Sequence, residues 1–273
     1  MKIIRVFPKQ TSHSPTGEDC FFGMPPIIIP DHDEVHISTV FTWDIPKARE
    51  LQYQWQGRTN KPVRMGGPAF NDRGGEFEPG RYVVEGITIT SRGCNNNCPF
   101  CFVPQREGRL RELKIKEGNV IYDNNFTQCN KAHQQKVFQM LSKQKAVKFS
   151  GGLEAGLITS EFVDDLRSLR IKEIWVAADG DYAMKNLQKA SRYLSPYFNQ
   201  NKLRCFVLIG FNDTKEQAEG RLRRVFELGF LPFAQLYKSG DKLRDDKLKA
   251  EWGSFARQWS RPAIYKNILK GGI

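Results

Sequence analysis

The sequence lacks any run of about 18 apolar residues, the length that a membrane-spanning helix needs. Its first residues, "MKIIRVFPKQTSHSPTGED", carry too many polar side chains for a signal peptide. Internal repeats of fixed period and low-complexity segments are absent as well. We therefore expect a cytoplasmic protein that has no membrane partner.

Cysteine is also scarce, with six residues in a chain of 273. So few cysteines in so long a chain argue against a disulfide scaffold, and the cytoplasm keeps thiols reduced. Three of the six nevertheless lie together in "CNNNCPFC" (94–101). Thiolates this close in the chain can converge on one metal centre.

Acidic residues are outnumbered, 30 against 42 lysines and arginines, which gives a formal net charge of +12. This balance favours polyanionic or phosphorylated partners, so a nucleic acid or a phosphorylated metabolite is a candidate substrate. The positive charge concentrates in residues 105–116, 220–225 and 257–270. The alternative is a set of solvated basic faces, because no interleaving of aromatic and basic residues matches a known nucleic-acid module.

Strand and helix signals alternate after residue 80. The expected strands span residues 82–90, 119–123, 146–150, 173–178, 203–210 and 232–237. Thr159 or Ser160 should cap one of the intervening helices, and Thr214 with Gln217 forms a capping box for another. Parallel strands that each lead into a helix or a long loop predict an α/β fold, here a partial (βα)6 TIM-like barrel over residues 81–240. Chemistry in such folds lies at the carboxyl ends of the strands.

Shorter segments flank this predicted barrel. Residues 1–30 are rich in Pro and Gly and indicate an irregular lead. A strand over 34–43, a helix after Asp44 and a strand over 61–67 then predict a small βαβ extension, so residues 1–80 form an N-terminal α/β extension. Residues 241–273 should form a helical tail that packs on the barrel.

The cysteine spacing is C-x3-C-x2-C, from Cys94 through Cys98 to Cys101, directly after the first predicted barrel strand. A structural zinc site usually closes with a second close pair of Cys or His ligands, and no such pair follows; the nearest candidates, Cys129 and His133, are isolated. Three cysteine ligands instead suit a [4Fe-4S] cluster with one open iron that can bind a substrate or cofactor. Zinc remains the alternative.

This spacing, with Phe100 just before the third cysteine, resembles the radical S-adenosylmethionine (radical SAM) enzymes. The resemblance implies that Cys94, Cys98 and Cys101 hold a [4Fe-4S] cluster and that SAM chelates its fourth iron. It also implies an electron donor such as flavodoxin or ferredoxin. In this family an electron from the cluster cleaves SAM to a 5′-deoxyadenosyl radical, which abstracts hydrogen from the substrate. Phe100 would lie near the adenine, and the substrate of this chain is not identified.

The ends of the second and third predicted barrel strands extend the resemblance. "DNNF" (123–126) is similar to the "DDNF" of radical SAM enzymes related to the cobalamin-binding and methylthiotransferase groups, which makes Asp123 and Asn125 cofactor-binding candidates. "SGGLEAG" (150–156) is similar to the Gly-Gly-Glu element that holds the SAM amino group, which implies this role for Gly151, Gly152 and Glu154. It departs from the family by an inserted leucine and by following strand three rather than strand two.

Two further strand ends and one cysteine complete the candidate site. The resemblance implies that Asp179, in "AADGD", bonds the SAM ribose. Gly210 lies in "VLIGFNDT", a stretch similar to the family's "IxGxP-G-T", and would let the chain pass near the adenine. Cys129 follows the "DNNFTQ" stretch and is the candidate hydrogen donor or radical partner, whereas Cys205 lies inside a strand and should be a core residue.

The N-terminal extension looks like a truncated form of the Rossmann-like domain that precedes the barrel in cobalamin-binding relatives. It lacks the Asp-x-His-x-x-Gly motif that supplies the lower cobalt ligand, so we expect no cobalamin. A second hypothesis from another functional class remains. In it, the chain is a zinc- or cluster-binding nucleic-acid module that uses its basic faces without catalysis.

Overall fold

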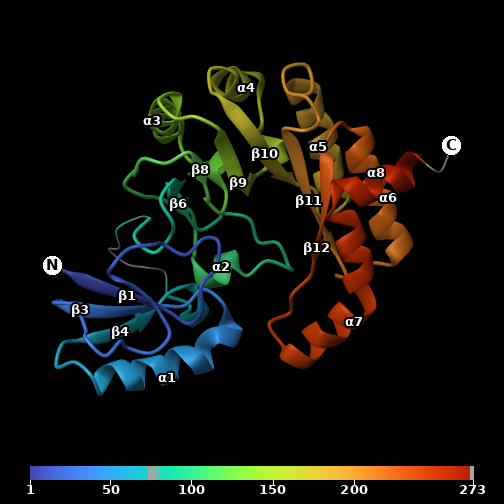
Figure 1. Ribbon diagram of the computed structural model, residues 1–273. Helices are drawn as coiled ribbons and strands as arrows, with labels where there is room; N and C mark the ends of the chain where they lie inside the picture. Colours follow the sequence, from blue (N-terminus) through green and yellow to red (C-terminus); the bar gives the residue numbers. More distant parts are fainter. Residues whose placement is uncertain (73–77, 79, 271–273) are drawn as a thin grey trace. The chain divides into compact units, whose positions relative to one another are not determined.

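The computed structural model describes residues 1–72, 78 and 80–270. The chain divides into two compact units, Met1–Asn97 with Phe102–Lys116 and Cys98–Cys101 with Glu117–Ile273. Both units have α/β structure with parallel strands, as the sequence predicts (Figure 1). The finer division into residues 1–80, 81–240 and 241–273 stays a prediction.

The first unit is built on a parallel four-stranded sheet in the order β2-β1-β3-β4. The strands are β1 (Ile3–Phe7), β2 (Cys20–Phe22), β3 (Glu34–Ser38) and β4 (Val63–Gly66). Because β1 and β2 fall within residues 1–30, the prediction of an irregular lead is wrong. The alternation in "IIRVF" explains β1, because Ile4 and Val6 are buried while Ile3 and Arg5 are partly exposed.

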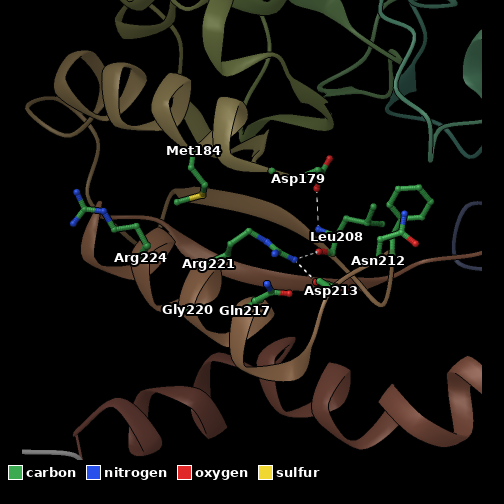
Figure 2. A pocket seen from close by; sticks show the side chains of 11 residues that line it. Asp179, Met184, Leu208, Asn212, Asp213, Gln217, Gly220, Arg221 and Arg224 are labelled. Atoms are coloured by element: carbon green, nitrogen blue, oxygen red, sulfur yellow. Dashed lines mark hydrogen bonds and ion pairs between the residues drawn. The ribbon is translucent and has the colours of Figure 1, made fainter.

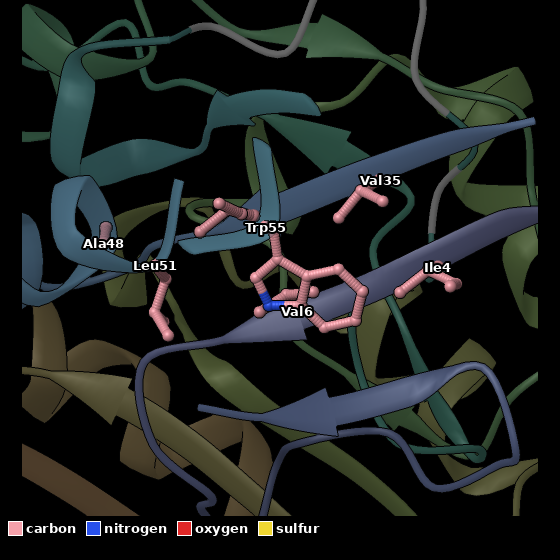
Figure 3. Packing of buried hydrophobic residues seen from close by; sticks show 7 residues of the cluster. Ile4, Val6, Val35, Ala48, Leu51 and Trp55 are labelled. Carbon is pink, nitrogen blue, oxygen red and sulfur yellow. The ribbon is translucent and has the colours of Figure 1, made fainter. Parts of the chain in front are cut away.

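One face of this sheet packs against α1 (Ile45–Gln56), the helix predicted to begin after Asp44 (Figure 3). Trp55 is fully buried at the centre of the cluster, and its indole Nε1 donates to the Gly23 carbonyl at 3.2 Å. Removing so large a buried aromatic side chain costs about 3–5 kcal/mol of stability. The buried cluster consists of Ile4, Val6, Val35, Ile37, Ala48, Leu51 and Trp55.

Short elements make up the rest of the first unit. They are η1 (Thr42–Asp44), η2 (Pro68–Phe70), β5 (Ile87–Thr88), β6 (Ser91–Arg92), α2 (Val103–Arg106) and β7 (Arg111–Glu112). The strand predicted over residues 82–90 is therefore reduced to the two residues of β5. Gly86 has a φ of +90°, a left-handed value that interrupts an extended chain before Ile87.

The second unit contains five parallel strands in the order β12-β11-β10-β9-β8. The strands are β8 (Val120–Ile121), β9 (Val147–Leu153), β10 (Ile171–Ala177), β11 (Leu203–Ile209) and β12 (Leu231–Leu236). The helices are η3 (Phe126–Gln128), α3 (Lys131–Ser142), η4 (Ala155–Leu157), α4 (Ser160–Arg167), α5 (Asp181–Leu194), α6 (Lys215–Glu227), α7 (Lys242–Trp259) and α8 (Pro262–Lys270). Each of these strands lies beside the next one in the chain.

Local signals define several of these helices. Thr159 caps α4 by accepting a hydrogen bond from the Phe162 amide at 3.2 Å, as predicted. The capping box of Thr214 and Gln217 begins α6, with both of its reciprocal hydrogen bonds present. The helix α8 lies within residues 241–273, where a helical tail was predicted; it begins at Pro262, a residue suited to the first helical turn.

The strand order places the candidate residues along one edge of the sheet. Parallel strands end on the same side, so the residues that follow β8, β9, β10 and β11 lie at a common edge. Side chains on one face of the sheet pack against the helices. Phe149 of β9, for example, is buried against the ring of Phe138 from α3. Within the described ranges, no helix combines the length and apolar character needed to cross a membrane.

Candidate functional site

The cysteine loop begins at Cys94, shortly after β6, and lies within the connection between β6 and its antiparallel partner β7. The Cys94 amide donates to the Gly108 carbonyl at 3.2 Å, and the Asn96 amide donates to the Cys94 sulfur at 3.4 Å. Gly93 has a φ of +83°, and a Cβ there would lie 2.2 Å from the Arg109 carbonyl oxygen. Only glycine therefore fits before Cys94, and this backbone contact fixes where the loop starts.

Cys98 and Cys101 belong to the second unit, where the Cys101 amide closes a turn onto the Cys98 carbonyl at 3.0 Å. The turn presents Phe100, whose ring meets the ring of Phe211 edge to face at 5.6 Å. Phe211 follows Gly210 at the end of β11. Phe100 and Gly210, which the resemblance assigns to one part of the cofactor, therefore lie in one neighbourhood.

Glu154, at the end of β9, is the centre of a polar network. Its Oε2 accepts hydrogen bonds from Asn125 Nδ2 at 2.8 Å and from Gln128 Nε2 at 2.9 Å. The Glu154 amide donates to Thr127 Oγ1 at 3.0 Å, and that hydroxyl donates to Asn125 Oδ1 at 2.7 Å. The structure thus brings the predicted Asn125 and Glu154 together in direct contact. Two donors from the 125–128 segment fix the orientation of the carboxylate.

Thr127 and Gln128 are members of this network that the sequence interpretation missed. Both lie within "DNNFTQ", on the short helix η3 that directly follows β8. The available signal was the run of amide and hydroxyl side chains at a strand end, where polar groups from neighbouring strands meet. Sequence reasoning selected only the residues that resemble the family stretch.

The two glycines before Glu154 have different structural roles. A Cβ at Gly151 would lie 1.9 Å from the carbonyl oxygen of Asp123, the residue that follows β8. Gly151 is therefore required by the close approach of a neighbouring chain segment, and its part in holding the SAM amino group stays a prediction. Gly152 has a φ of +93°, a left-handed value that favours glycine. A Cβ at Gly152 would lie 3.8 Å from the Phe206 ring, which is an ordinary contact distance. Asp123 itself is buried.

A cavity of about 580 Å³ lies at the ends of β10 and β11, where α5 and α6 begin (Figure 2). Asp179 lines it and accepts a hydrogen bond from the Leu208 amide at 2.8 Å. Burial raises the pKa of Asp179, while the Leu208 hydrogen bond and the Arg221 charge oppose that rise. The lining residues are Asp179, Gly180, Met184, Leu208, Phe211, Asn212, Asp213, Gln217, Gly220, Arg221 and Arg224.

Arg221 sits at the centre of this cavity wall. Its Nη2 donates to the Leu208 carbonyl at 3.0 Å and pairs with the buried carboxylate of Asp213. The guanidinium is therefore mostly enclosed rather than part of a solvated basic face on α6, which was the alternative for residues 220–225. Its neighbours Arg223 and Arg224 do form surface pairs, with Glu219 and Glu227. Arg221 and Gln217 are four residues apart on α6, so the helical repeat alone predicts that they lie on the same face of the helix.

The cavity combines groups suited to a nucleoside. Asp179 provides an acceptor for hydroxyl groups, and Met184 and Phe211 provide apolar surface. Apart from the adjoining residues and the backbone of the same helix, no atom lies within 4 Å of the position that a Cβ would take at Gly180 or at Gly220, so the space beside both residues is open. The ribose contact that the resemblance implies for Asp179 stays a prediction.

The remaining candidates are mainly structural in their contacts. Gly210 has a φ of +77°, and a Cβ there would lie 3.1 Å from Leu236; its amide donates to Asp213 at 2.8 Å. Cys129 directly follows η3 and is buried, with its carbonyl accepting from Gln134 Nε2 at 2.9 Å. Cys205 is fully buried in β11, which confirms its assignment to the core, and burial raises the pKa of its thiol well above the usual value.

The metal assignment rests on the chemistry of the donor set. Cys94, Cys98 and Cys101 are partly exposed cysteines that lie within eight residues of chain. Such thiols suit an iron-sulfur cluster or zinc. Among the residues that the structure describes, no three His, Cys, Asp or Glu side chains are arranged to hold a metal ion.

Comparison with known proteins gave no match, either to a protein-family model or to a curated protein. The candidate site is therefore defined by this chain's own residues.

Proposed function

We propose that this protein is a radical SAM enzyme. The observation that carries the proposal is the C-x3-C-x2-C cysteine loop in a chain whose parallel strands end in carboxylates, Glu154 after β9 and Asp179 after β10. A bound [4Fe-4S] cluster would supply the electron that cleaves SAM to a 5′-deoxyadenosyl radical able to abstract hydrogen. Cys94, Cys98 and Cys101 would hold it.

The strand order supports a partial (βα)6 TIM-like barrel as the framework of this activity. In β12-β11-β10-β9-β8 every strand lies beside its neighbour in the sequence, and every pair is parallel. Crossovers between such strands are right-handed, so successive helices lie on the same face of the sheet. A sheet covered on one face only, without a reversal of strand order, is the arrangement that curls into a barrel.

The local contacts support distinct roles for the site residues. Glu154, oriented by Asn125, would accept from the charged amino group of SAM, because a carboxylate pairs strongly with an ammonium. Asp179 would accept from the ribose hydroxyls in the cavity that it lines. Phe100 would pack near the adenine.

Three glycines and one cysteine complete the proposed roles. Gly151 keeps the end of β9 close to Asp123, Gly152 adopts the left-handed conformation there, and Gly210 shapes the turn after β11. Cys129, which directly follows η3 and lies four residues after Asn125, is the candidate hydrogen donor or radical partner.

The test is cleavage of SAM by protein purified and reconstituted with iron and sulfide without oxygen. With a chemical reductant, the wild-type chain should convert SAM to 5′-deoxyadenosine and methionine, and Cys98→Ala should not. Cys20→Ala serves as the control, because Cys20 lies in β2, far along the chain from the loop. A wild-type protein that binds one zinc and leaves SAM intact would contradict the proposal and favour the nucleic-acid module.

A further inference from the structure

Two aromatic side chains at the end of β3 stack on each other at the surface of the first unit. The rings of Phe41 and Trp43 are nearly parallel, with an interplanar angle of 8° and centroids 4.6 Å apart. Trp43 is 57% exposed and Phe41 is 38% exposed. Large aromatic residues are expensive to leave in water, so an exposed stacked pair is a feature that needs a reason.

The place of this pair in the sheet is the one at which parallel α/β sheets bind ligands. In the order β2-β1-β3-β4, the chain leaves β1 toward one side and leaves β3 toward the other. Ligands of open parallel sheets bind at the carboxyl ends of the two strands where this direction reverses. Lys9 follows β1 and the aromatic pair follows β3, so both flank that point.

Lys9 approaches the pair from the side. Its Nζ lies 5.3 Å from the Phe41 centroid and 5.8 Å from the Trp43 centroid, which are themselves 4.6 Å apart. A point almost equally distant from both centroids lies beside the stack, so Lys9 does not cover the outer face of either ring. Asp44 holds the ammonium there through an ion pair of 3.2 Å.

The backbone beneath the pair is fixed. The Thr39 amide donates to the Gly66 carbonyl at 3.0 Å, and the Thr39 carbonyl accepts from the Ala69 amide at 3.2 Å. Gly67 has a φ of +112°, and a Cβ there would lie 2.6 Å from the Thr39 carbonyl oxygen. The segment that carries Phe41 is therefore held against the chain that follows β4, and the aromatic pair is a preformed surface.

We infer that this stacking surface, Phe41 and Trp43 with Lys9 beside them, binds a base of a single-stranded nucleic acid. Every nucleobase offers a flat face, and stacking of a base on an exposed aromatic ring is the usual way in which proteins hold unpaired strands. The net charge of +12 favours a polyanion over a single nucleotide. An open platform with more than half of Trp43 exposed also suits a strand that passes over it. This inference does not depend on the cluster or on SAM.

Lys9 has a secondary role in this arrangement. Because Asp44 already neutralises much of its charge, the ammonium mainly keeps the rings in place and adds one weak phosphate contact. The energy that a bound base gains should therefore come from the outer ring faces. This distinguishes the surface from the general basic character of the chain, which attracts any nucleic acid in proportion to its charge.

The experiment measures fluorescence anisotropy of a labelled 12-nucleotide single strand with the full-length protein at low salt. Trp43→Ala should weaken binding by about five-fold to a hundred-fold, the range expected for one lost base stack, with the salt dependence unchanged. Trp43→Phe should retain most of the affinity, and Lys9→Gln should lose less than Trp43→Ala. The matched control is Tyr53→Ala, which removes an 81% exposed aromatic from α1.

Three outcomes would overturn the inference. They are equal affinity of Trp43→Ala and wild type, equal binding of a duplex of the same sequence, and displacement of the strand by adenosine monophosphate at a matching base concentration. Circular dichroism confirms that the variants are folded. Iron content and SAM cleavage are measured on the same preparations, and Cys98→Ala should bind the strand like wild type, so this inference and the proposed function can fail separately.

Discussion

Replacing Glu154 by glutamine tests the SAM contact without disturbing the network around it. In the wild-type chain, Glu154 Oε2 accepts from Asn125 at 2.8 Å and from Gln128 at 2.9 Å. A glutamine side chain has the same shape and keeps a carbonyl oxygen for both donors, but it carries no charge. Any change in SAM affinity therefore reports the charge on residue 154 and not a change in its position.

The expected magnitude follows from the strength of the hydrogen bond. A bond between charged groups contributes about 1.5–3 kcal/mol, whereas a neutral one contributes about 0.5–1.5 kcal/mol. Glu154→Gln should therefore weaken SAM binding by about ten-fold, since 1.4 kcal/mol corresponds to one factor of ten. Glu154→Ala should weaken it further and should also lower the free energy of unfolding by about 1–3 kcal/mol, because Asn125 and Gln128 lose a shared acceptor.

Isothermal titration calorimetry on anaerobic, cluster-loaded protein measures the SAM affinity, and urea unfolding measures the stability. Glu161→Gln is the matched control, because it removes the same charge from α4, where the side chain is 77% exposed and paired with Lys131. Wild-type SAM affinity in Glu154→Gln would refute the role assigned to this carboxylate. Equal weakening in Glu161→Gln would show that only the net charge matters.

Two further changes test the framework of the site. Burial raises the pKa of Asp179 above 3.8, so ionising this carboxylate costs the folded state stability as the pH rises through the raised value. Asp179→Asn removes that cost, and its free energy of unfolding relative to wild type should increase from about pH 4 to pH 7 in urea titrations; a constant difference would contradict the burial effect. Gly151→Ala places a Cβ 1.9 Å from the Asp123 carbonyl oxygen and should lower the unfolding free energy by about 1–3 kcal/mol or more. An unchanged urea midpoint would show that β8 and β9 are not this close.

Local sequence signals predicted the helices of the second unit well because their determinants are close in the chain. The caps at Thr159 and Thr214 depend on residues three positions away, and both form as predicted. The prediction of a long strand over residues 82–90 was wrong for an equally local reason. Gly86 has a left-handed conformation, which the alternating pattern of residues does not reveal. β1 was missed because its partner strand β3 lies about thirty residues further along the chain.

The candidate site was predictable at the level of strand ends but not of individual contacts. Asp123, Glu154 and Asp179 could be identified because parallel strands end at one edge. The hydrogen bonds from Asn125 and Gln128 to Glu154 join residues that are 29 and 26 positions apart, and they depend on side-chain reach that a sequence pattern does not contain. The burial of Arg221 against Asp213 arises in the same way, from packing between α6 and the turn that precedes it.

Iron analysis of the anaerobically reconstituted protein tests the central claim most directly. If Cys94, Cys98 and Cys101 hold a [4Fe-4S] cluster, the wild-type chain and Cys20→Ala should each contain about four irons with matching sulfide, and Cys98→Ala should lose them together with the visible absorbance. Full iron content in Cys98→Ala, or a colourless wild-type protein with one zinc, would contradict the account.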